Sequence, residues 1–280
     1  MFGLPVDADL KQYIRDLFQP NKCRLDTRFV IRDGKKHPFA VIAPGGAYAK
    51  VCSYIEGVPF ARELNRHGIS AFIVYYHTKE MARFPAPQRD LARAVKYIFK
   101  NSERFGLDTD HYSVWGSSAG GHLAASFGTQ NMGYAKYSLP KPEAMILIYP
   151  VISMLKEYTQ KDTHDNLLGP DASLRGEMFT SVEEHVTDAY PPTYIWIGDA
   201  DETVQPENAA RMVRALAAAG VKYENELFPG VGHGVGLGNG TSAEGWIRKA
   251  IQFWYCCMRW KSVMGISFSL RSSLLPWHSG

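Results

Sequence analysis

The sequence contains a serine that is flanked by glycines in the pattern of a nucleophile. Ser118 is the central residue of Gly-Ser-Ser-Ala-Gly (116–120), which follows an apolar run at 112–116 and opens a helical pattern. A strand-to-helix turn this sharp crowds the backbone, so it needs glycine two positions to either side of the serine. We expect Ser118 to attack a carbonyl group, with the Ala119 amide at the helix N-terminus facing the oxyanion. A small-residue turn without chemistry is the alternative.

An acid and a base that could serve this serine follow it in the chain order Ser, Asp, His. His233 lies in the stretch Phe-Pro-Gly-Val-Gly-His-Gly after the last expected strand. There it could take the serine proton while a carboxylate fixes its tautomer. The loop after the strand at 193–198 offers two carboxylates, Asp199 and Asp201. We favour Asp201, because Val204 can anchor its loop in the core, and Asp199 is the alternative.

A second glycine-rich turn could supply the remaining oxyanion donors. Pro-Gly-Gly-Ala-Tyr (44–48), the glycine loop, directly follows the apolar strand at 39–43. Glycines here let backbone N–H groups approach a substrate oxygen without intervening side chains, and hydrolases with such a serine place donors in this loop. Gly46 and Ala47 are the candidate donors, and a plain tight turn is the alternative.

Bringing these loops together requires a sheet whose strands end at one edge. From residue 39 the chain alternates short apolar runs with longer amphipathic ones. Such runs indicate an α/β fold with a mainly parallel central sheet and helices on both faces, which binds ligands at the carboxyl ends of its strands. The expected strands are 39–43, 70–76, 112–116, 144–149, 193–198 and 222–228, and the expected helices are 56–67, 87–106, one from 118, 206–219 and 243–254.

The 280 residues are expected to form a single domain, as α/β chains of this length commonly do. That domain would span residues 1–260, with a small cap inserted at about 151–190, where a polar, turn-rich stretch separates two core strands. Residues 261–280 contain no acid and show neither helical nor strand periodicity. We interpret them as an atypical C-terminal tail that is foreign to the fold. An added element that packs on the body or mediates association is the alternative.

Composition and motifs exclude several classes of function. The formal net charge is +3, but five basic residues and no acids follow Glu244, so the main body lacks the basic surface of a nucleic-acid binder. No apolar run approaches the ~18 residues of a membrane helix, and the acidic N-terminus is unlike a secretion signal. Four cysteines without a spaced framework favour a reducing compartment, so we expect a cytoplasmic location. Neither a metal nor a cofactor is expected, because their motifs are absent from the sequence.

Three further polar residues fit structural roles better than chemical ones. His122 lies one helical turn after Ser118, where a packing or capping role is favoured. Glu56 and Asp90 each fall in a predicted helix beside a glycine or an arginine, so we interpret both as structural.

The segments that carry these motifs resemble the esterase/lipase group of the α/β-hydrolase fold, which includes bacterial acetyl-xylan-esterase-like and BD-FAE-like carbohydrate esterases. The similar stretches are APGGAY, RDLARAVKYI, VWGSSAGGHLAA, ILIYPVIS, YPPTYIWIGDADETVQPENA and FPGVGHGVGL, within about 36–254. The resemblance implies Ser118 as the nucleophile, Asp201 as the acid and His233 as the base. It implies a serine carboxylesterase that hydrolyses short-chain acyl esters through an acyl-enzyme, with acetyl or feruloyl esters of plant carbohydrates as substrates.

Two positions depart from that family pattern. Ala47 stands where a third glycine is common, and Gln205 separates Val204 from Pro206. Neither change removes a catalytic group, so a small-molecule or oligosaccharide ester remains the expected partner. Two other classes stay open: a serine peptidase of the same fold, which usually carries an extra gating domain, and a non-catalytic binding protein on a hydrolase scaffold, which can lose a triad member at no cost.

Overall fold

A seven-stranded sheet forms the centre of the computed structural model, which describes the backbone of residues 23–263 and the side chains of 23–258. The strand order is β1-β3-β2-β4-β5-β6-β7; β1 pairs antiparallel with β3, and the other pairings of the described strands are parallel. The predicted α/β fold with a mainly parallel sheet is thereby confirmed. The strands are β1 (Arg24–Phe29), β2 (His37–Ala43), β3 (Ser70–Tyr75), β4 (Leu107–Ser117), β5 (Ala144–Ile148), β6 (Thr193–Gly198) and β7 (Tyr223–Phe228).

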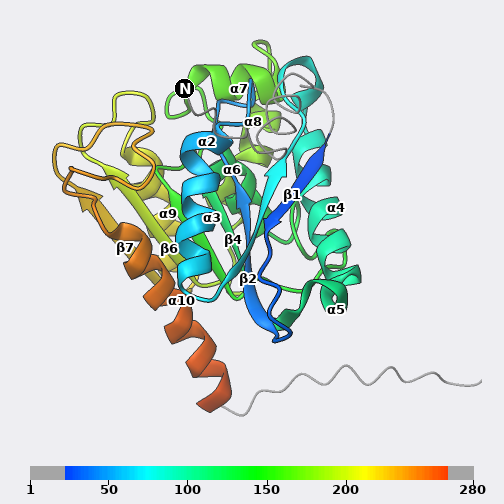
Figure 1. The fold of residues 1–280 in the computed structure, drawn as a ribbon. Coiled ribbons are helices and arrows are strands. Elements are labelled where there is room, and N and C mark those ends of the chain that lie inside the picture. Colours follow the sequence, from blue (N-terminus) through cyan, green and yellow to red (C-terminus); the bar gives the residue numbers. More distant parts are fainter. Residues whose placement is uncertain (1–22, 264–280) are drawn as a thin grey trace, which may run out of the picture.

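Helices cover both faces of the sheet (Figure 1). Helices α3 and α10 pack on one face and contact each other, whereas α4, α6 and α9 lie on the other face. Every residue of α6 is buried, because this helix starts at the centre of the sheet and consists mainly of small and apolar residues. The helices are α2 (Ser53–Glu56), α3 (Val58–Arg66), η1 (Lys79–Ala82), α4 (Ala86–Lys100), α5 (Ser102–Phe105), α6 (Ser118–Phe127), α7 (Lys161–Leu168), α8 (Leu174–Thr180), η2 (Val182–His185), α9 (Glu207–Ala218) and α10 (Trp246–Val263).

Two predicted helices have different bounds in the structure. The expected helix at 56–67 corresponds to α3, which begins only after Gly57, and a separate short helix, α2, precedes that glycine. The expected helix at 87–106 is divided at Asn101 into α4 and α5. A Cβ atom on Gly57 would lie 2.9 Å from the carbonyl oxygen of Ser53, so the tight turn there requires glycine. Helix α2 was not predicted, whereas the apolar periodicity continues across Asn101, which is why the sequence alone predicts one helix at 87–106.

Helix α10 is longer than predicted. It was expected to end at residue 254 but continues to Val263, since the intervening residues include neither proline nor glycine. Its added turns contact the body: the Tyr255 hydroxyl donates a hydrogen bond of 2.9 Å to the carbonyl of His67, and Cys257 is buried. The rest of the expected tail, 264–280, lies outside the described residues.

Strand β1 was not predicted. Its sequence, Arg-Leu-Asp-Thr-Arg-Phe, alternates charged residues with others, unlike the continuous apolar runs of the central strands. As an edge strand it is buried on fewer sides. The charge on Asp26 is accommodated by Arg28, whose Nη2 lies 2.7 Å from Oδ2 of the aspartate.

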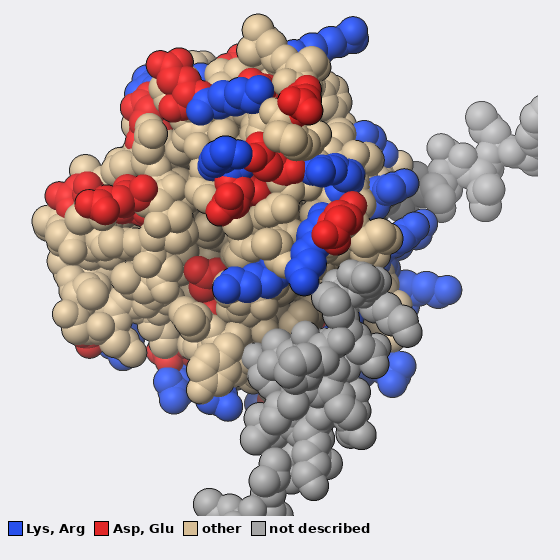
Figure 2. Space-filling model, turned by 90° about the horizontal axis from the view of Figure 1, so that it is seen from above, with Lys and Arg blue, Asp and Glu red and all other residues tan. Residues whose placement is uncertain are grey.

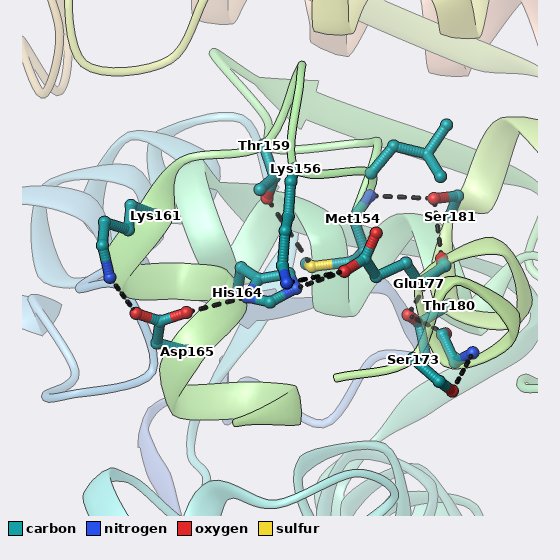
Figure 3. Close-up of polar contacts among 12 residues, drawn as sticks. Met154, Lys156, Thr159, Lys161, His164, Asp165, Ser173, Glu177, Thr180 and Ser181 are labelled. Carbon is teal, nitrogen blue, oxygen red and sulfur yellow. Dashed lines mark hydrogen bonds and ion pairs between the residues drawn. The ribbon is translucent and has the colours of Figure 1, made fainter. Parts of the chain in front are cut away.

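Residues 151–190, the expected cap, contain α7, α8 and η2, and α7 and α8 lie at the top of the molecule in Figure 1, on the side where the parallel strands end. His164 of α7 is buried between two carboxylates (Figure 3). Its Nδ1 lies 2.8 Å from Oδ1 of Asp165, and its Nε2 lies 3.2 Å from Oε1 of Glu177. Because Glu177 belongs to α8, this cluster ties the two helices of the segment together.

The surface of this top side carries charges of both signs. Figure 2 shows lysine and arginine side chains intermixed with aspartate and glutamate, so neither sign dominates the face in view. Among the described helices, none is both long and apolar enough to cross a membrane.

Candidate active site

The turn around Ser118 has the strained geometry that its sequence predicts. Strand β4 ends at Ser117, α6 begins at Ser118, and Ser118 has a φ of +53° although it is not glycine. A Cβ on Gly116 would lie 2.1 Å from the carbonyl oxygen of Gly120, and a Cβ on Gly120 would lie 2.1 Å from that of Ala43. Both glycines are therefore required by close backbone packing.

His233 joins Ser118 to Asp201 by two hydrogen bonds. Its Nε2 lies 2.8 Å from Oγ of Ser118, and its Nδ1 lies 2.7 Å from Oδ2 of Asp201. A carboxylate can only accept, so the Nδ1 proton faces Asp201 and Nε2 is left to accept the serine proton. The three side chains, which follow three different strands, thus form the hydrogen-bond relay that nucleophilic acyl transfer by serine needs.

The two candidate acids in the loop after β6 have different hydrogen-bond partners. Oδ1 of Asp201 accepts hydrogen bonds from the amides of Thr203 (3.0 Å) and Val204 (2.8 Å), which aim Oδ2 at His233. Asp199 is exposed and instead accepts a hydrogen bond of 2.6 Å from the amide of Gly230. The structure therefore brings Asp201 to His233, and it assigns Asp199 to the turn that follows β7.

The glycine loop packs directly against the nucleophile. A Cβ on Gly45 would lie 2.8 Å from Cβ of Ser118, so only glycine allows this approach. Gly46 has a φ of +124° and Ala47 one of +54°. Neither of these two amides donates a hydrogen bond to a described residue, whereas the Gly45 amide is occupied by the side chain of Glu56. The amides of Gly46 and Ala47 are thus free of described partners in the loop whose Gly45 packs on Ser118, and Ala119 lies in the first turn of α6.

His122 forms hydrogen bonds to the glycine loop and to α8. It is fully buried; its Nε2 donates a hydrogen bond of 2.8 Å to the carbonyl of Thr180, and its Nδ1 accepts one of 2.9 Å from the hydroxyl of Tyr48. Burial lowers the pKa of His122 to about 4, so the imidazole is neutral at pH 7. A neutral histidine thus connects the glycine loop to the end of α8.

Two residues beside the site were missed as site residues in the sequence. Glu56, interpreted there as structural, is buried, and its Oε1 lies 2.9 Å from the hydroxyl of Tyr149. The ring of Tyr149 packs edge-on against the imidazole of His233, with 5.0 Å between their centroids. The sequence signal was weak, because Glu56 and Tyr149 are 93 positions apart and each reads as part of an ordinary helix or strand end.

Comparisons with known proteins agree with this architecture. The family model BD-FAE matches residues 25–216. Endo-1,4-beta-xylanase B of Butyrivibrio fibrisolvens is 29% identical over 263 residues, covering 87% of this chain and 41% of that protein. Acetylxylan esterase of Xylanibacter ruminicola is 29% identical over 202 residues, covering 70% of this chain and 40% of that protein. The chain thus spans about two fifths of the length of these two relatives.

Solved structures show the same fold. The acetyl ester-xyloside bifunctional hydrolase of Caldicellulosiruptor lactoaceticus superposes with a TM-score of 0.73 at 28% identity, over 89% of this chain and 90% of that one. A carboxylesterase of Lactobacillus plantarum gives a TM-score of 0.67 at 22% identity, over 88% and 94% of the two chains, a likeness of fold alone. The sheet, the turn at Ser118 and the family match lead to one conclusion: this chain is a member of the BD-FAE family and has the α/β-hydrolase fold.

Proposed function

We propose that this protein is a serine carboxylesterase with Ser118 as nucleophile, His233 as general base and Asp201 as the acid that orients the base. The observation that carries the proposal is the relay of hydrogen bonds from Ser118 through His233 to Asp201, at 2.8 and 2.7 Å. Such a relay lets the imidazole take the hydroxyl proton as the oxygen attacks, while the carboxylate stabilises the imidazolium.

The reaction would proceed in two halves. Oγ of Ser118 adds to the ester carbonyl while His233 takes its proton, and the amides of Gly46, Ala47 and Ala119 stabilise the resulting oxyanion. When the intermediate collapses, the bond to the alcohol oxygen breaks, His233 returns the proton to that oxygen, and an acyl ester remains on Ser118. A water molecule, deprotonated by His233, then attacks the acyl carbonyl. When this second intermediate collapses, the bond to Oγ of Ser118 breaks, His233 returns the proton to Oγ, and the carboxylic acid is released.

We propose short acyl esters of plant carbohydrates as the substrates, with acetyl esters first and feruloyl esters as the second candidate. The printed names of an acetylxylan esterase and an acetyl ester-xyloside hydrolase among the similar proteins support this class. The cap segment 151–190 supports it as well, because α7 is fastened to the glycine loop and to the loop after β3. Asn166 donates to the carbonyl of Ala47 (2.8 Å), and the Phe84 amide donates to that of Leu167 (2.9 Å). These two bonds fix the cap to the loops around Ser118, and we propose that a cap fixed in this way favours short acyl groups.

A substrate panel tests this proposal on one preparation. It would include p-nitrophenyl acetate, butyrate and octanoate, acetylated xylo-oligosaccharides, a feruloyl sugar and an aminoacyl-p-nitroanilide. We expect hydrolysis of the acetyl esters and no turnover of the anilide. A peptidase would show the reverse preference, and a binding protein on this scaffold would hydrolyse none of them while still binding an acetylated sugar in calorimetry.

A further inference from the structure

Glu56 is a buried carboxylate beside the site that the proposed reaction does not use. It is 4% exposed, and each of its oxygens has one hydrogen-bond donor. Oε2 accepts from the amide of Gly45 at 2.7 Å, and Oε1 accepts from the hydroxyl of Tyr149 at 2.9 Å. Among the residues that the structure describes, no lysine or arginine forms an ion pair with it. Burying a carboxylate without such a counter-charge lowers the stability of the fold, because its desolvation is not compensated by an ion pair. Its presence beside the site therefore indicates a functional role.

Tyr149 carries the contact from Glu56 to the catalytic histidine. Its hydroxyl accepts a hydrogen bond of 3.2 Å from the amide of Gly236, so its own proton is free to be donated to Glu56. Its ring lies edge-on to the imidazole of His233, at a centroid distance of 5.0 Å and an interplanar angle of 66°. Tyr149 also has a φ of +34°, a conformation that only close packing maintains in a residue with a side chain. The tyrosine is thus held in place against both the histidine and its loop.

The groups around Glu56 leave His233 as the one neighbour among the described residues that becomes cationic during the proposed reaction. The titratable groups that face it are Cys52, Tyr76, Tyr149 and His233. Burial raises the pKa of the thiol and of both phenols, so these three groups are neutral at pH 7. Burial also raises the pKa of Glu56, while its two hydrogen-bond donors and His233 act in the opposite direction.

We propose that Glu56 is a positioning residue for the ester hydrolysis: its carboxylate holds the glycine loop at Gly45, holds the His233 ring through Tyr149, and stabilises the imidazolium that forms when Ser118 attacks. This inference rests on the proposed function. It differs from a purely structural role because the charge of the carboxylate, and not only its shape, acts on the histidine.

The test compares Glu56→Gln and Tyr149→Phe with the wild type over a range of pH. Glutamine keeps the shape of the Glu56 side chain and removes its charge. Phenylalanine keeps the ring of Tyr149 and removes the hydrogen bond to Glu56. Two matched controls change similarly buried groups near the start of the β4–β5 pairing, away from the carboxyl ends of the strands. Glu143→Gln alters a carboxyl that precedes β5, and Tyr112→Phe removes a hydroxyl that donates to the carbonyl of Pro140.

Two readouts separate positioning from folding. We expect Glu56→Gln to lower kcat for p-nitrophenyl acetate by roughly 10- to 100-fold with little change in KM, as for a misplaced catalytic group. We expect the rising limb of its pH profile to move to lower pH, because a negative charge that favours the imidazolium is removed. Tyr149→Phe should lower kcat with a smaller movement of the limb, because the carboxylate remains. Neither control should change kcat more than about twofold or move the limb.

The same shift is measurable without activity, as the midpoint of the His233 imidazole titration by NMR in a Ser118→Ala background. A folded Glu56→Gln protein with an unmoved midpoint, or with kcat within twofold of the wild type, would overturn the inference. If Glu56→Gln does not fold, Tyr149→Phe decides, and wild-type kcat in that variant would overturn it. A wild type that hydrolyses no ester would refute the proposed function instead, while the NMR comparison would still decide whether Glu56 acts on His233.

Discussion

The side chain of Asn166, on cap helix α7, donates a hydrogen bond of 2.8 Å to the carbonyl oxygen of Ala47 in the glycine loop. This bond connects two segments that are 119 positions apart in the chain. Ala47 has a positive φ, and a non-glycine residue keeps such a conformation only when its surroundings hold it. The cap is therefore hydrogen-bonded directly to the loop that packs against Ser118.

We expect Asn166→Ala to lower kcat/KM for p-nitrophenyl acetate by about fivefold, corresponding to one neutral hydrogen bond of about 1 kcal/mol. The matched control is Asn101→Ala, which removes a side-chain hydrogen bond of the same kind, to Tyr97 at the end of α4. The control should keep wild-type kcat/KM. Equal activity of the two variants would show that the cap does not position the loop.

The two aspartates after β6 should differ sharply in their effect on rate. Asp201→Asn should lower kcat by ~10⁴, because His233 then loses the carboxylate that fixes its tautomer. Asp199→Asn should lower kcat by less than about tenfold, since its carboxylate bonds the amide of Gly230 and does not contact the histidine. Steady-state kinetics at saturating substrate compares them. The reverse ranking would transfer the acid role to Asp199.

Stability should depend on pH through His122. The folded pKa of this group is about 4, below its ordinary value near 6.5, because burial disfavours the charged form. The unfolded chain therefore binds a proton in the window from pH 6.5 to 4 that the folded protein does not, and stability falls as pH falls through that window. The loss should amount to about 3 kcal/mol.

Urea unfolding at pH 7 and at pH 4.5 measures this effect. A His122→Gln variant should be less stable than the wild type at pH 7, because it loses well-placed hydrogen bonds, but its stability should change less between the two pH values. If both proteins lose stability equally on acidification, other groups are responsible and His122 is not the buried neutral histidine described above.

Acyl-chain length should be limited by the cap. We expect kcat/KM to decrease from acetyl through butyryl to octanoyl p-nitrophenyl esters. Tight binding of an octanoyl chain would require an apolar trough, in which burial of each methylene contributes about 0.8 kcal/mol of binding free energy. Segment 151–190 instead places the polar cluster of His164, Asp165 and Glu177 between its helices. A value for octanoate above that for acetate would contradict this prediction.

The sequence predicted the parts of the site that follow from strand ends. Ser118, Asp201 and His233 each follow the end of a parallel strand in one sheet, so their convergence follows from the order of motifs and strands. The Glu56–Tyr149 contact could not be predicted, because it depends on packing between residues distant in the chain. Strand β1 was missed for a different reason: as an edge strand it tolerates alternating charges, which hides the apolar signal that marked the central strands.

The role of Ser118 is tested most directly by Ser118→Ala beside its neighbour Ser117→Ala. Both serines are buried at the β4–α6 turn, but of the two only Ser118 forms a hydrogen bond from its Oγ to Nε2 of His233. Initial rates of p-nitrophenyl acetate hydrolysis should fall by ~10⁶ in Ser118→Ala, with an unchanged circular-dichroism spectrum. Ser117→Ala should lose no more than about tenfold. Retention of a tenth of the wild-type rate by Ser118→Ala would contradict a mechanism in which this serine is the nucleophile.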